Sequence, residues 1–364
     1  MPKCASSAIQ SALSSSEFYV SNGDILYVEI NANGSLVYGE NLLIKAKQSP
    51  FQYSASVPIE TLLLLDDNQI QKIKKELELL LNDYKAIILS NEGWGVKPEQ
   101  VNTFFESLFD EKKAYEVIVI GYIRPQVDWF NSAWWQWGAW TENSLDRWLG
   151  HSLEHVNWYR VIKEWNNLLW VDKIIIRILN SDVISDFMGI INAKFTNNTI
   201  SNKSLSGILL RFFQFNRELR IDSHDSEIEF ILTRWLDFEK QETPWVLGQK
   251  QVENILNHHK EGNTKLLSLL DDESRQLFLK DTRWHSNEKY MSKINEFIKL
   301  DELPEDLVEE LIYSCENAIC KIKHKYGNII STDILKLEGL SRETVALTYI
   351  KQIILLDEEI RRLP

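Results

Sequence analysis

The chain has few cysteines and few basic residues for its length. Its 364 residues include three cysteines, and 40 lysines and arginines stand against 53 aspartates and glutamates, a formal net charge of −13 at pH 7. Three cysteines cannot form the disulfide framework of a secreted protein of this size, so we expect a cytoplasmic location. The acidic balance argues against wide contact with a nucleic-acid backbone, which needs clustered positive charge. A small anionic ligand can still bind where lysine and arginine are concentrated.

Long apolar runs are absent as well. No stretch approaches the roughly 20 apolar residues of a membrane span, and the N-terminus lacks the apolar core of a signal peptide. We therefore expect no transmembrane segment. Hydrophobic residues make up 44% of the chain and charged residues 26%, which are ordinary values for a folded protein. The length suffices for one large domain or two medium ones.

Apolar strands alternate with helices in the first half of the chain. Such alternation predicts an α/β fold with a parallel sheet covered on both faces, in which ligands bind at the carboxyl ends of the strands. Beyond about residue 190 the periodicity is almost entirely helical. We predict an α/β core over residues 1–190 and a helical part over residues 191–364 that completes the domain. The predicted strands are 24–30, 86–89, 116–122 and 173–179; the predicted helices begin near residues 8, 98 and 126 or span 60–84, 182–191, 204–218, 226–239, 249–259, 265–279, 287–299, 304–325 and 341–362.

The first thirteen residues, M-P-K-C-A-S-S-A-I-Q-S-A-L, pass from Lys3 through small residues into a helix. A helix N-terminus presents unpaired backbone N–H groups and the positive end of the helix dipole, which favour an anion. Lys3 adds a mobile positive charge, and Ser6 and Ser7 can donate hydroxyl hydrogen bonds. An equally weighted alternative is a frayed N-terminus with a serine-capped helix. A G-x-x-x-x-G-K-[ST] nucleotide loop is excluded, because Lys3 precedes the turn.

A second motif, R-P-Q-V-D-W-F-N-S, runs from Arg124 to Ser132. Arg124 lies at the predicted end of a strand, and Ser132 lies two helical turns farther on. A guanidinium group pairs with two phosphate oxygens, and a hydroxyl on the following helix can add a third hydrogen bond. Alone, the motif is more typical of an arginine that caps carbonyls and a serine on a solvated helix face. The two motifs together, in this order and about two strand–helix units apart, favour a site with two anion pockets.

Together these motifs resemble the sulfotransferases that use 3'-phosphoadenosine 5'-phosphosulfate (PAPS). P-K-x-x-[ST]-[ST] followed by an apolar helix is similar to the family's 5'-phosphosulfate loop, and the Arg124–Ser132 pair is similar to its 3'-phosphate site. The resemblance implies a three-layer parallel sheet of the sulfotransferase P-loop type, PAPS as co-substrate and no required metal. It implies that PAPS is bound by Lys3, Cys4, Ala5, Ser6, Ser7, Ala8, Arg124 and Ser132.

Two features depart from the family's pattern. Ala5 stands where the family usually has glycine, so one backbone contact differs. The family also places an apolar strand directly before the loop, whereas this sequence begins at the loop. We therefore expect that the first strand of the sheet is missing, or that the natural start lies upstream of Met1.

Other segments narrow the resemblance to bacterial sulfotransferases that act on carbohydrates. Ser90-Asn91-Glu92 resembles the group's S-x-E at a strand end, and Asp186-Phe187 resembles its D-F on a helix. The resemblance covers about residues 1–280 and implies transfer of a sulfuryl group to a carbohydrate hydroxyl, in the synthesis of a surface polysaccharide or glycolipid, with residues 191–364 completing the acceptor cleft. The remaining segments that look like this group are Trp165 with Arg177, residues 202–206 (N-K-S-L-S) and residues 262–266 (G-N-T-K-L).

The chemistry of sulfuryl transfer suggests roles for two residues. Lys3 would shield the leaving phosphate, and Glu92, at a strand end near the loop, is the candidate general base. The alternative for Glu92 is a carboxylate that caps a strand-to-helix turn. His151 and His155 are rival bases four residues apart on one helix face, a spacing that also permits a metal pair. Without a nearby cysteine or an H-E-x-x-H pattern, we predict no metal site.

Nine of the 13 tryptophans fall between residues 128 and 170. Tryptophan is usually packed into a core, so we expect most of them to be structural. Indole faces also stack on sugar rings, and we assign contact with the acceptor to Trp94, Trp135 and His155. Lys97 and Arg177 are predicted as further anion contacts.

Two other functions stay open on the sequence. The chain can be a non-catalytic nucleotide- or glycan-binding protein derived from the same fold, which the missing strand and Ala5 would favour. It can also be an enzyme that uses another adenosine nucleotide, although no magnesium-binding hydroxyl follows a Gly-Lys pair.

Overall fold

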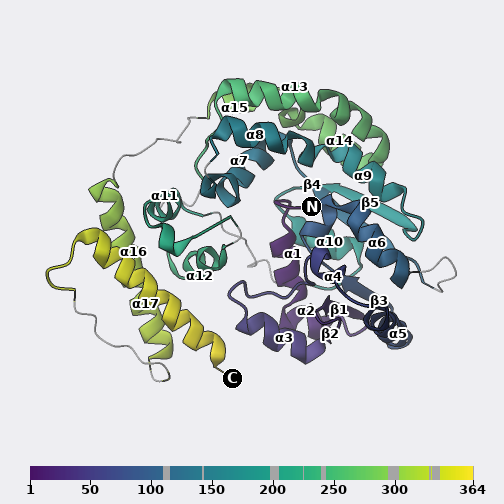
Figure 1. The fold of residues 1–364 in the computed structure, drawn as a ribbon, viewed down its shortest axis with the longest axis horizontal. Helices are drawn as coiled ribbons and strands as arrows, with labels where there is room; N and C mark the ends of the chain where they lie inside the picture. The colour runs from purple at the N-terminus through teal and green to yellow at the C-terminus, as the bar shows by residue number, and fades with distance from the viewer. Residues whose placement is uncertain are drawn as a thin grey trace.

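The computed structural model of the chain describes residues 1–109, 115–141, 143–196, 205–223, 225–238, 243–293, 303–327, 329 and 337–363. Two small sheets and their covering helices lie on one side of the molecule, and a pair of long helices near the C-terminus lies on the other (Figure 1). Parallel strand pairs and intervening helices confirm the predicted α/β class. Among the described residues, no helix is both long and apolar enough to cross a membrane.

The strands form two separate sheets. β1 (Ile25–Ile30) pairs in parallel with β3 (Ala86–Leu89) and antiparallel with the short β2 (Leu36–Tyr38). β4 (Ile118–Ile123) pairs in parallel with β5 (Lys173–Ile178), in register from Ile118 opposite Lys173 to Ile123 opposite Ile178. The parallel pairing follows the prediction. The antiparallel β2 does not, because no strand was predicted between residues 30 and 86.

β3 and β4 are not hydrogen-bonded to each other in the part of the chain that the structure describes. Met1 lies against both sides of this interruption. A Cβ added to Gly95, which follows β3, would lie 2.9 Å from Met1 Sδ, and one added to Gly121 of β4 would lie 3.6 Å from Met1 Cε. The prediction of a single sheet is therefore wrong for the described residues. The N-terminal residues, and not a strand, lie between the two sheets.

The helices of the first half largely follow the predictions. The expected helix over residues 60–84 is instead two helices, because Asp66 and Gln69 form a capping box that begins a new helix at Asp67. The N-terminal helix begins at Ser6, two residues before its predicted start. The helices described up to residue 191 include α1 (Ser6–Leu13), α2 (Ser16–Ser21), α3 (Gly39–Gln48), α4 (Ile59–Leu62), α5 (Asp67–Asp83), α6 (Pro98–Leu108), α7 (Gln126–Gln136), α8 (Leu145–Ser152), α9 (Trp158–Asn166) and α10 (Val183–Ile190).

Two apolar cores lie on opposite faces of β1. Leu26, Val28 and Ile30 belong to a core shared with α5, α6 and α9. Tyr27, which alternates with them, belongs to a larger core shared with α1, α7 and the later helices. This period of two explains why β1 forms a strand with helices on both sides.

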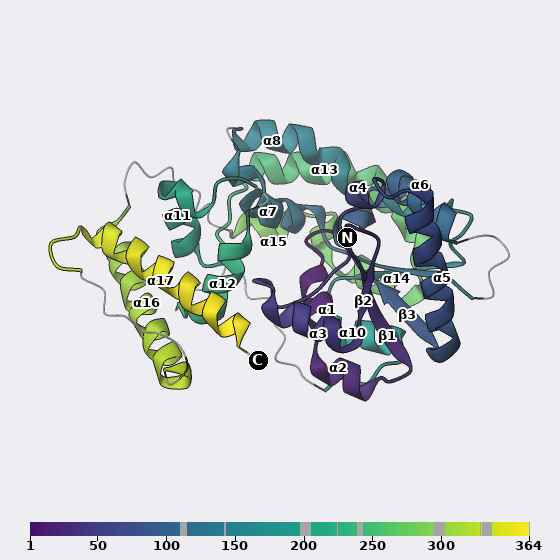
Figure 2. The same ribbon diagram turned by 60° about the horizontal axis from the view of Figure 1, so that its bottom comes forward.

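The helices after residue 191 divide between two places. α13 packs on α7 and α9, and α14 packs on β5, so these helices cover the α/β part. α16 and α17 pack on each other and reach the rest of the chain through α11, α12 and α3, as both views show (Figures 1 and 2). The described bounds are α11 (Gly207–Phe215), α12 (Glu227–Trp235), α13 (Gln249–Leu266), α14 (Asp272–Lys280), α15 (Glu288–Met291), α16 (Glu305–Tyr326) and α17 (Arg342–Arg362).

Three of the predicted helices need correction. The helix predicted over 249–259 continues to Leu266, and the one predicted over 265–279 contains a break before α14. The helix predicted over 287–299 is described only as α15, and residues 294–300 lie outside the described residues. The start of the helix predicted over 204–218, and residues 202–204 of the N-K-S-L-S segment, lie outside them too.

A buried carboxylate joins α17 to α12. Asp357 is fully buried and accepts hydrogen bonds from Arg234 Nη1, from Trp235 Nε1 at 2.8 Å and from Arg361 Nε at 2.7 Å. Both arginines also donate to the segment that follows α3. Arg234 Nη2 bonds to the carbonyl of Pro50, and Arg361 Nη1 to that of Gln48, each at 2.5 Å. The C-terminal helix therefore positions residues 48–50.

Candidate functional site

The N-terminal loop turns sharply before α1. Lys3 has φ 56° and Ala5 has φ 69°, so both adopt the left-handed region that favours glycine. Ala5 is the N-cap residue of α1, and no side chain caps this helix. The backbone N–H groups of Ala5, Ser6, Ser7 and Ala8 donate to no group among the described residues. The serine-capped alternative is therefore wrong, and the helix presents open donors at its N-terminus.

Lys3 and Arg124 lie together although they are 121 residues apart. Arg124 follows β4, and its Nη1 donates to the backbone carbonyl of Lys3 at 3.2 Å. Among the described residues, no carboxylate lies within ion-pair distance of Lys3 Nζ or of the Arg124 guanidinium. Two partly buried cations without an ion-pair partner in this part of the chain favour binding of an anion.

Burial also changes the protonation of Lys3. Loss of contact with water lowers the pKa of its ammonium group, and the nearby positive charges of Arg124 and Arg220 lower it further, while Glu92 acts in the opposite direction. A bound anion would supply the missing negative charge and raise this pKa. The site therefore gains electrostatically from an anionic ligand.

Glu92 contacts the loop from the end of β3. Its Oε1 accepts the backbone N–H of Lys3 at 3.0 Å. The turn that presents it is fixed by Asn91, whose side chain accepts the N–H of Gly93 at 2.7 Å and donates to the carbonyl of Ser56 at 2.6 Å. Glu92 thus holds Lys3 in its left-handed conformation, and its second carboxylate oxygen has no partner among the described residues.

The other predicted PAPS contacts are divided between the loop and the core. Ser6 and Ser132 are partly buried and donate to no described group, and Ser7 Oγ accepts the hydroxyl of Tyr53 at 3.4 Å. The Cys4 side chain is buried in the core, where loss of solvation raises the pKa of its thiol to about 11. The backbone N–H of Cys4 donates to the carbonyl of Met1 at 3.2 Å, so the prediction that Cys4 binds the donor needs correction, and Ala8 can contribute only its backbone N–H.

Three tryptophans position the loops of the site, a role that the sequence analysis did not assign to them. Their indole N–H groups donate to backbone carbonyls in irregular segments. Without these bonds the carbonyls would have no hydrogen-bond partner. The tryptophan-rich sequence was the available signal, but it does not show where an N–H group points. Trp129 bonds to Pro2 O, Trp158 to Arg124 O and Trp165 to Gly95 O, each at 2.9 Å.

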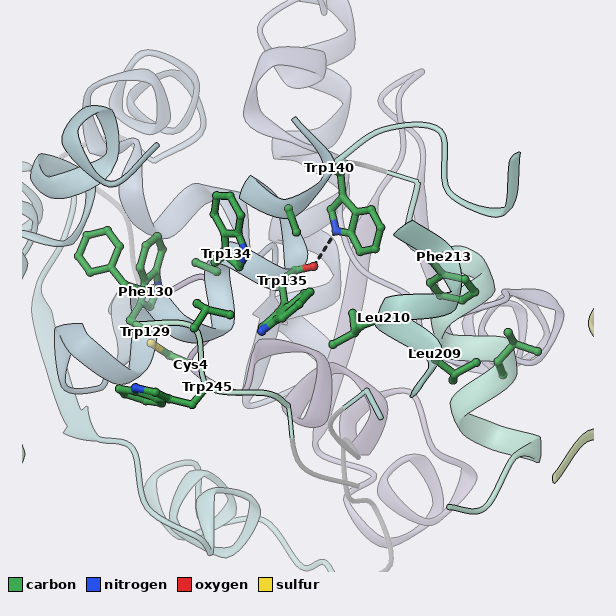
Figure 3. Close-up of a cluster of buried hydrophobic side chains, with 14 of the residues drawn as sticks. Cys4, Trp129, Phe130, Trp134, Trp135, Trp140, Leu209, Leu210, Phe213 and Trp245 are labelled. Atoms are coloured by element: carbon green, nitrogen blue, oxygen red, sulfur yellow. Dashed lines mark hydrogen bonds between the residues drawn. The ribbon is translucent and has the colours of Figure 1, made fainter. Parts of the chain in front are cut away.

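Most of the tryptophans between residues 128 and 170 are structural, as predicted. Eight of the nine are buried, and only Trp137 is partly exposed. Figure 3 shows the indoles of Trp134, Trp135 and Trp140 in one core with Leu210 and Phe213 of α11, and the Trp140 N–H donates to the Trp135 carbonyl at 2.6 Å.

The residues assigned to the acceptor and to further anion contacts need correction. Trp94 and Trp135 are 7% and 4% exposed, and their N–H groups bond to the carbonyls of Val57 and Pro244, so neither indole faces an open surface. Lys97 pairs with Glu60. Arg177 is surrounded by three carboxylates, with its Nη1 2.7 Å from Asp271 and 3.1 Å from Glu273, and its Nε 3.7 Å from Asp186. Both cations are therefore already neutralised.

The histidines contact neither Lys3 nor Glu92 in the described structure. His151 lies in the last turn of α8 and His155 follows on a short 3-10 helix, and both are exposed. His258 bonds to Glu154 at 2.9 Å, and burial lowers the pKa of His259 to about 4. The described residues contain no group of three or more side chains that could hold a metal ion.

The described cavities lie elsewhere. One of about 260 Å³ is lined by Trp235, Asp237, Ser314, Asn317, Cys320 and Lys321, between the end of α12 and α16. Its neighbour is a shallow depression along Cys320, Lys321, His324 and Lys325. Neither is lined by Lys3, Glu92 or Arg124.

The left-handed Ala5 predicts a test of the loop. Ala5→Gly should raise the free energy of unfolding by about 0.5–1 kcal/mol, because it removes a Cβ penalty of about 1–2 kcal/mol and adds part of glycine's entropic cost. Urea unfolding measures this change. Ala8→Gly, inside α1, is the matched control and should be destabilising by about 1 kcal/mol. Equal destabilisation by both substitutions would contradict the left-handed conformation of Ala5.

Comparisons with family models, with curated proteins and with solved structures gave no match to this chain.

Proposed function

We propose that the chain is a PAPS-dependent sulfotransferase that transfers a sulfuryl group to a hydroxyl, most simply that of a carbohydrate in surface polysaccharide or glycolipid synthesis. One observation carries the proposal. Lys3 and Arg124, from motifs 121 residues apart, meet at the open N-terminus of α1, and no carboxylate of the described residues is paired with either. A single nucleotide with anionic groups at two positions matches that arrangement of charges.

The chain's own residues suit the groups of the donor. The open N–H groups before and in the first turn of α1, with Lys3 and the Ser6 hydroxyl, would hold the 5'-phosphosulfate end. Arg124 and the Ser132 hydroxyl, which have no carboxylate or other side-chain partner among the described residues, would hold the 3'-phosphate. PAPS supplies the activated sulfuryl group. Trp129 and Trp158 hold the two pockets in a fixed relative position through hydrogen bonds to the carbonyls of Pro2 and Arg124.

The residues also suit the reaction. The acceptor oxygen forms a bond to sulfur while the bond between sulfur and the 5'-phosphate oxygen breaks. Glu92 takes the proton of the acceptor hydroxyl on its unbonded oxygen, and Lys3 with the helix N–H groups stabilises the negative charge left on the phosphate. The products are a sulfate ester and adenosine 3',5'-bisphosphate. Transfer of this kind depends mainly on alignment and charge, which a rigid loop supplies.

Binding of adenosine 3',5'-bisphosphate, followed by calorimetry, tests the proposal. We expect the unmodified chain to bind it, and Arg124→Ala to weaken binding by about 100-fold, because charge-assisted hydrogen bonds contribute about 1.5–3 kcal/mol each. Lys97→Ala is the matched control, since Lys97 is already paired with Glu60, and its affinity should be unchanged.

The outcomes separate the alternatives. Absence of binding to the unmodified chain would refute the proposal together with its non-catalytic nucleotide-binding variant. Binding without consumption of PAPS in the presence of carbohydrate acceptors would favour the non-catalytic protein.

A further inference from the structure

Three aromatic residues form a partly exposed cluster beside the N-terminal loop. Phe51 and Tyr53 lie in the segment that follows α3, and Phe230 lies on α12, about 180 residues later in the sequence. The ring centroids of Phe51 and Phe230 are 5.0 Å apart at 83°, and those of Tyr53 and Phe230 are 6.2 Å apart at 70°. Unlike Trp94 and Trp135, all three residues keep some exposed surface. We call them the Phe51 cluster.

The Phe51 cluster contacts the N-terminal loop that precedes α1 and the first turn of that helix. Tyr53 donates its hydroxyl to Ser7 Oγ at 3.4 Å, and the carboxylate of Glu92 lies within electrostatic range of the same phenol. Burial raises the pKa of Tyr53 to about 12, so the phenol stays protonated and acts as the donor. Ser7 then keeps its own hydroxyl hydrogen for a ligand. The cluster is therefore continuous with the residues assigned to the donor.

The segment that carries Phe51 and Tyr53 is held under backbone strain. Gln52, between the two rings, has φ 57°, a conformation that costs a non-glycine residue of order 1 kcal/mol and persists only when its surroundings impose it. The restraint is visible two residues earlier, at Pro50, whose carbonyl accepts Arg234 Nη2 at 2.5 Å. The Gln52 side chain is exposed. The loop thus presents two rings and an amide at a fixed place.

We propose that the Phe51 cluster binds the acceptor, and that the acceptor is an uncharged pyranose ring. A pyranose has an apolar C–H face, which packs on aromatic rings, and a rim of hydroxyls, which the Gln52 amide and the Ser7 hydroxyl can bond. Tyr53 bonds to Ser7 and lies within electrostatic range of Glu92, so a pyranose on the cluster would have a rim hydroxyl near the end of the loop where Lys3 lies. This inference rests on the proposed function for its role in transfer, but the binding surface stands on its own contacts.

Saturation-transfer NMR on the full chain, with methyl β-D-galactopyranoside, methyl β-D-glucopyranoside and methyl α-D-mannopyranoside as probes, tests the inference. We expect saturation of the ring protons of at least one pyranoside. Phe230→Leu, which keeps apolar volume but removes the ring, should reduce affinity by about fivefold. Phe215→Leu, at an exposed phenylalanine on α11, is the matched control and should leave the signal unchanged. Calorimetry with adenosine 3',5'-bisphosphate should give the same affinity in both variants.

Each of the other possible outcomes refutes one part of the inference or the proposed function on which it rests. A pyranoside signal that is equal in Phe230→Leu and the unmodified chain refutes the binding surface, whether or not the nucleotide binds. Saturation of 4-nitrophenol, but of none of the pyranosides, refutes the carbohydrate class. Loss of nucleotide binding in the unmodified chain, with pyranoside saturation retained, refutes the proposed function while leaving the cluster as a sugar-binding surface.

Discussion

Lys3→Met is expected to lower the rate constant of sulfuryl transfer by about 10²- to 10³-fold and, at neutral pH, to raise the free energy of unfolding by about 1 kcal/mol. The first effect follows from removal of the cation that shields the leaving phosphate. The second follows from removal of a partly buried charge that has no ion-pair partner among the described residues. Methionine is unbranched and of similar length, so it can occupy the same space. Turnover of PAPS and thermal unfolding measure the two effects.

The stability gain should depend on pH with a definite sign. Burial lowers the pKa of Lys3 in the folded protein below its ordinary value of 10.5. Between the lowered pKa and 10.5 the unfolded chain binds more protons than the folded chain, so the stability of the unmodified protein rises with pH across that window. The difference between Lys3→Met and the unmodified protein should therefore shrink as pH rises through the folded pKa.

Lys97→Met is the matched control for Lys3→Met. Lys97 is exposed and paired with Glu60, so its replacement should change neither the rate of transfer nor the stability by more than about 0.5 kcal/mol. Destabilisation by Lys3→Met at neutral pH would show that the ammonium of Lys3 holds the fold together. In that case a loss of activity in this variant would say nothing about the leaving group.

Local patterns predicted the elements whose signals lie within one segment. The predicted bounds lie within a few residues of the observed ones for β1, β3, α6 and the two long C-terminal helices. Their signals are apolar alternation, helical spacing, and Pro98 or Ser341 at a helix start. These signals act over short stretches of sequence. β2 was missed, because three residues carry too little periodicity. Its pairing with β1 is a contact between segments, and no local pattern contains it.

The two motifs at Lys3 and Arg124 could be selected from the sequence, but their meeting could not be derived from spacing alone. The Arg124 bond to the Lys3 carbonyl depends on Met1 and Pro2 lying between β3 and β4, where Trp129 and Gly95 hold them. The burial of Trp94 and Trp135, two of the residues assigned to the acceptor, could not be predicted for a related reason. A tryptophan-rich stretch signals large apolar surfaces, but whether a core or a ligand covers them is decided by distant segments.

Asp357→Ala is expected to lower the free energy of unfolding by about 3–5 kcal/mol, because it leaves the guanidinium groups of Arg234 and Arg361 without their buried counter-charge and the indole N–H of Trp235 without its acceptor. Urea unfolding measures the loss. Arg362→Ala is the control on the same helix, since its pair with Glu358 is exposed and should contribute at most about 0.5 kcal/mol.

A compensated variant separates lost charge pairing from lost packing at Asp357. Asp357→Leu combined with Arg234→Met and Arg361→Met removes all three charges and keeps apolar volume, so it should recover most of the stability lost in Asp357→Ala. It should not restore the segment that follows α3, because the bonds from both arginines to the carbonyls of Gln48 and Pro50 are gone. If residues 48–53 need those bonds to present Phe51 and Tyr53, this variant will fold stably, bind adenosine 3',5'-bisphosphate with unchanged affinity and bind pyranosides more weakly. Unchanged binding of pyranosides would show instead that the strained loop keeps its conformation without the C-terminal helix.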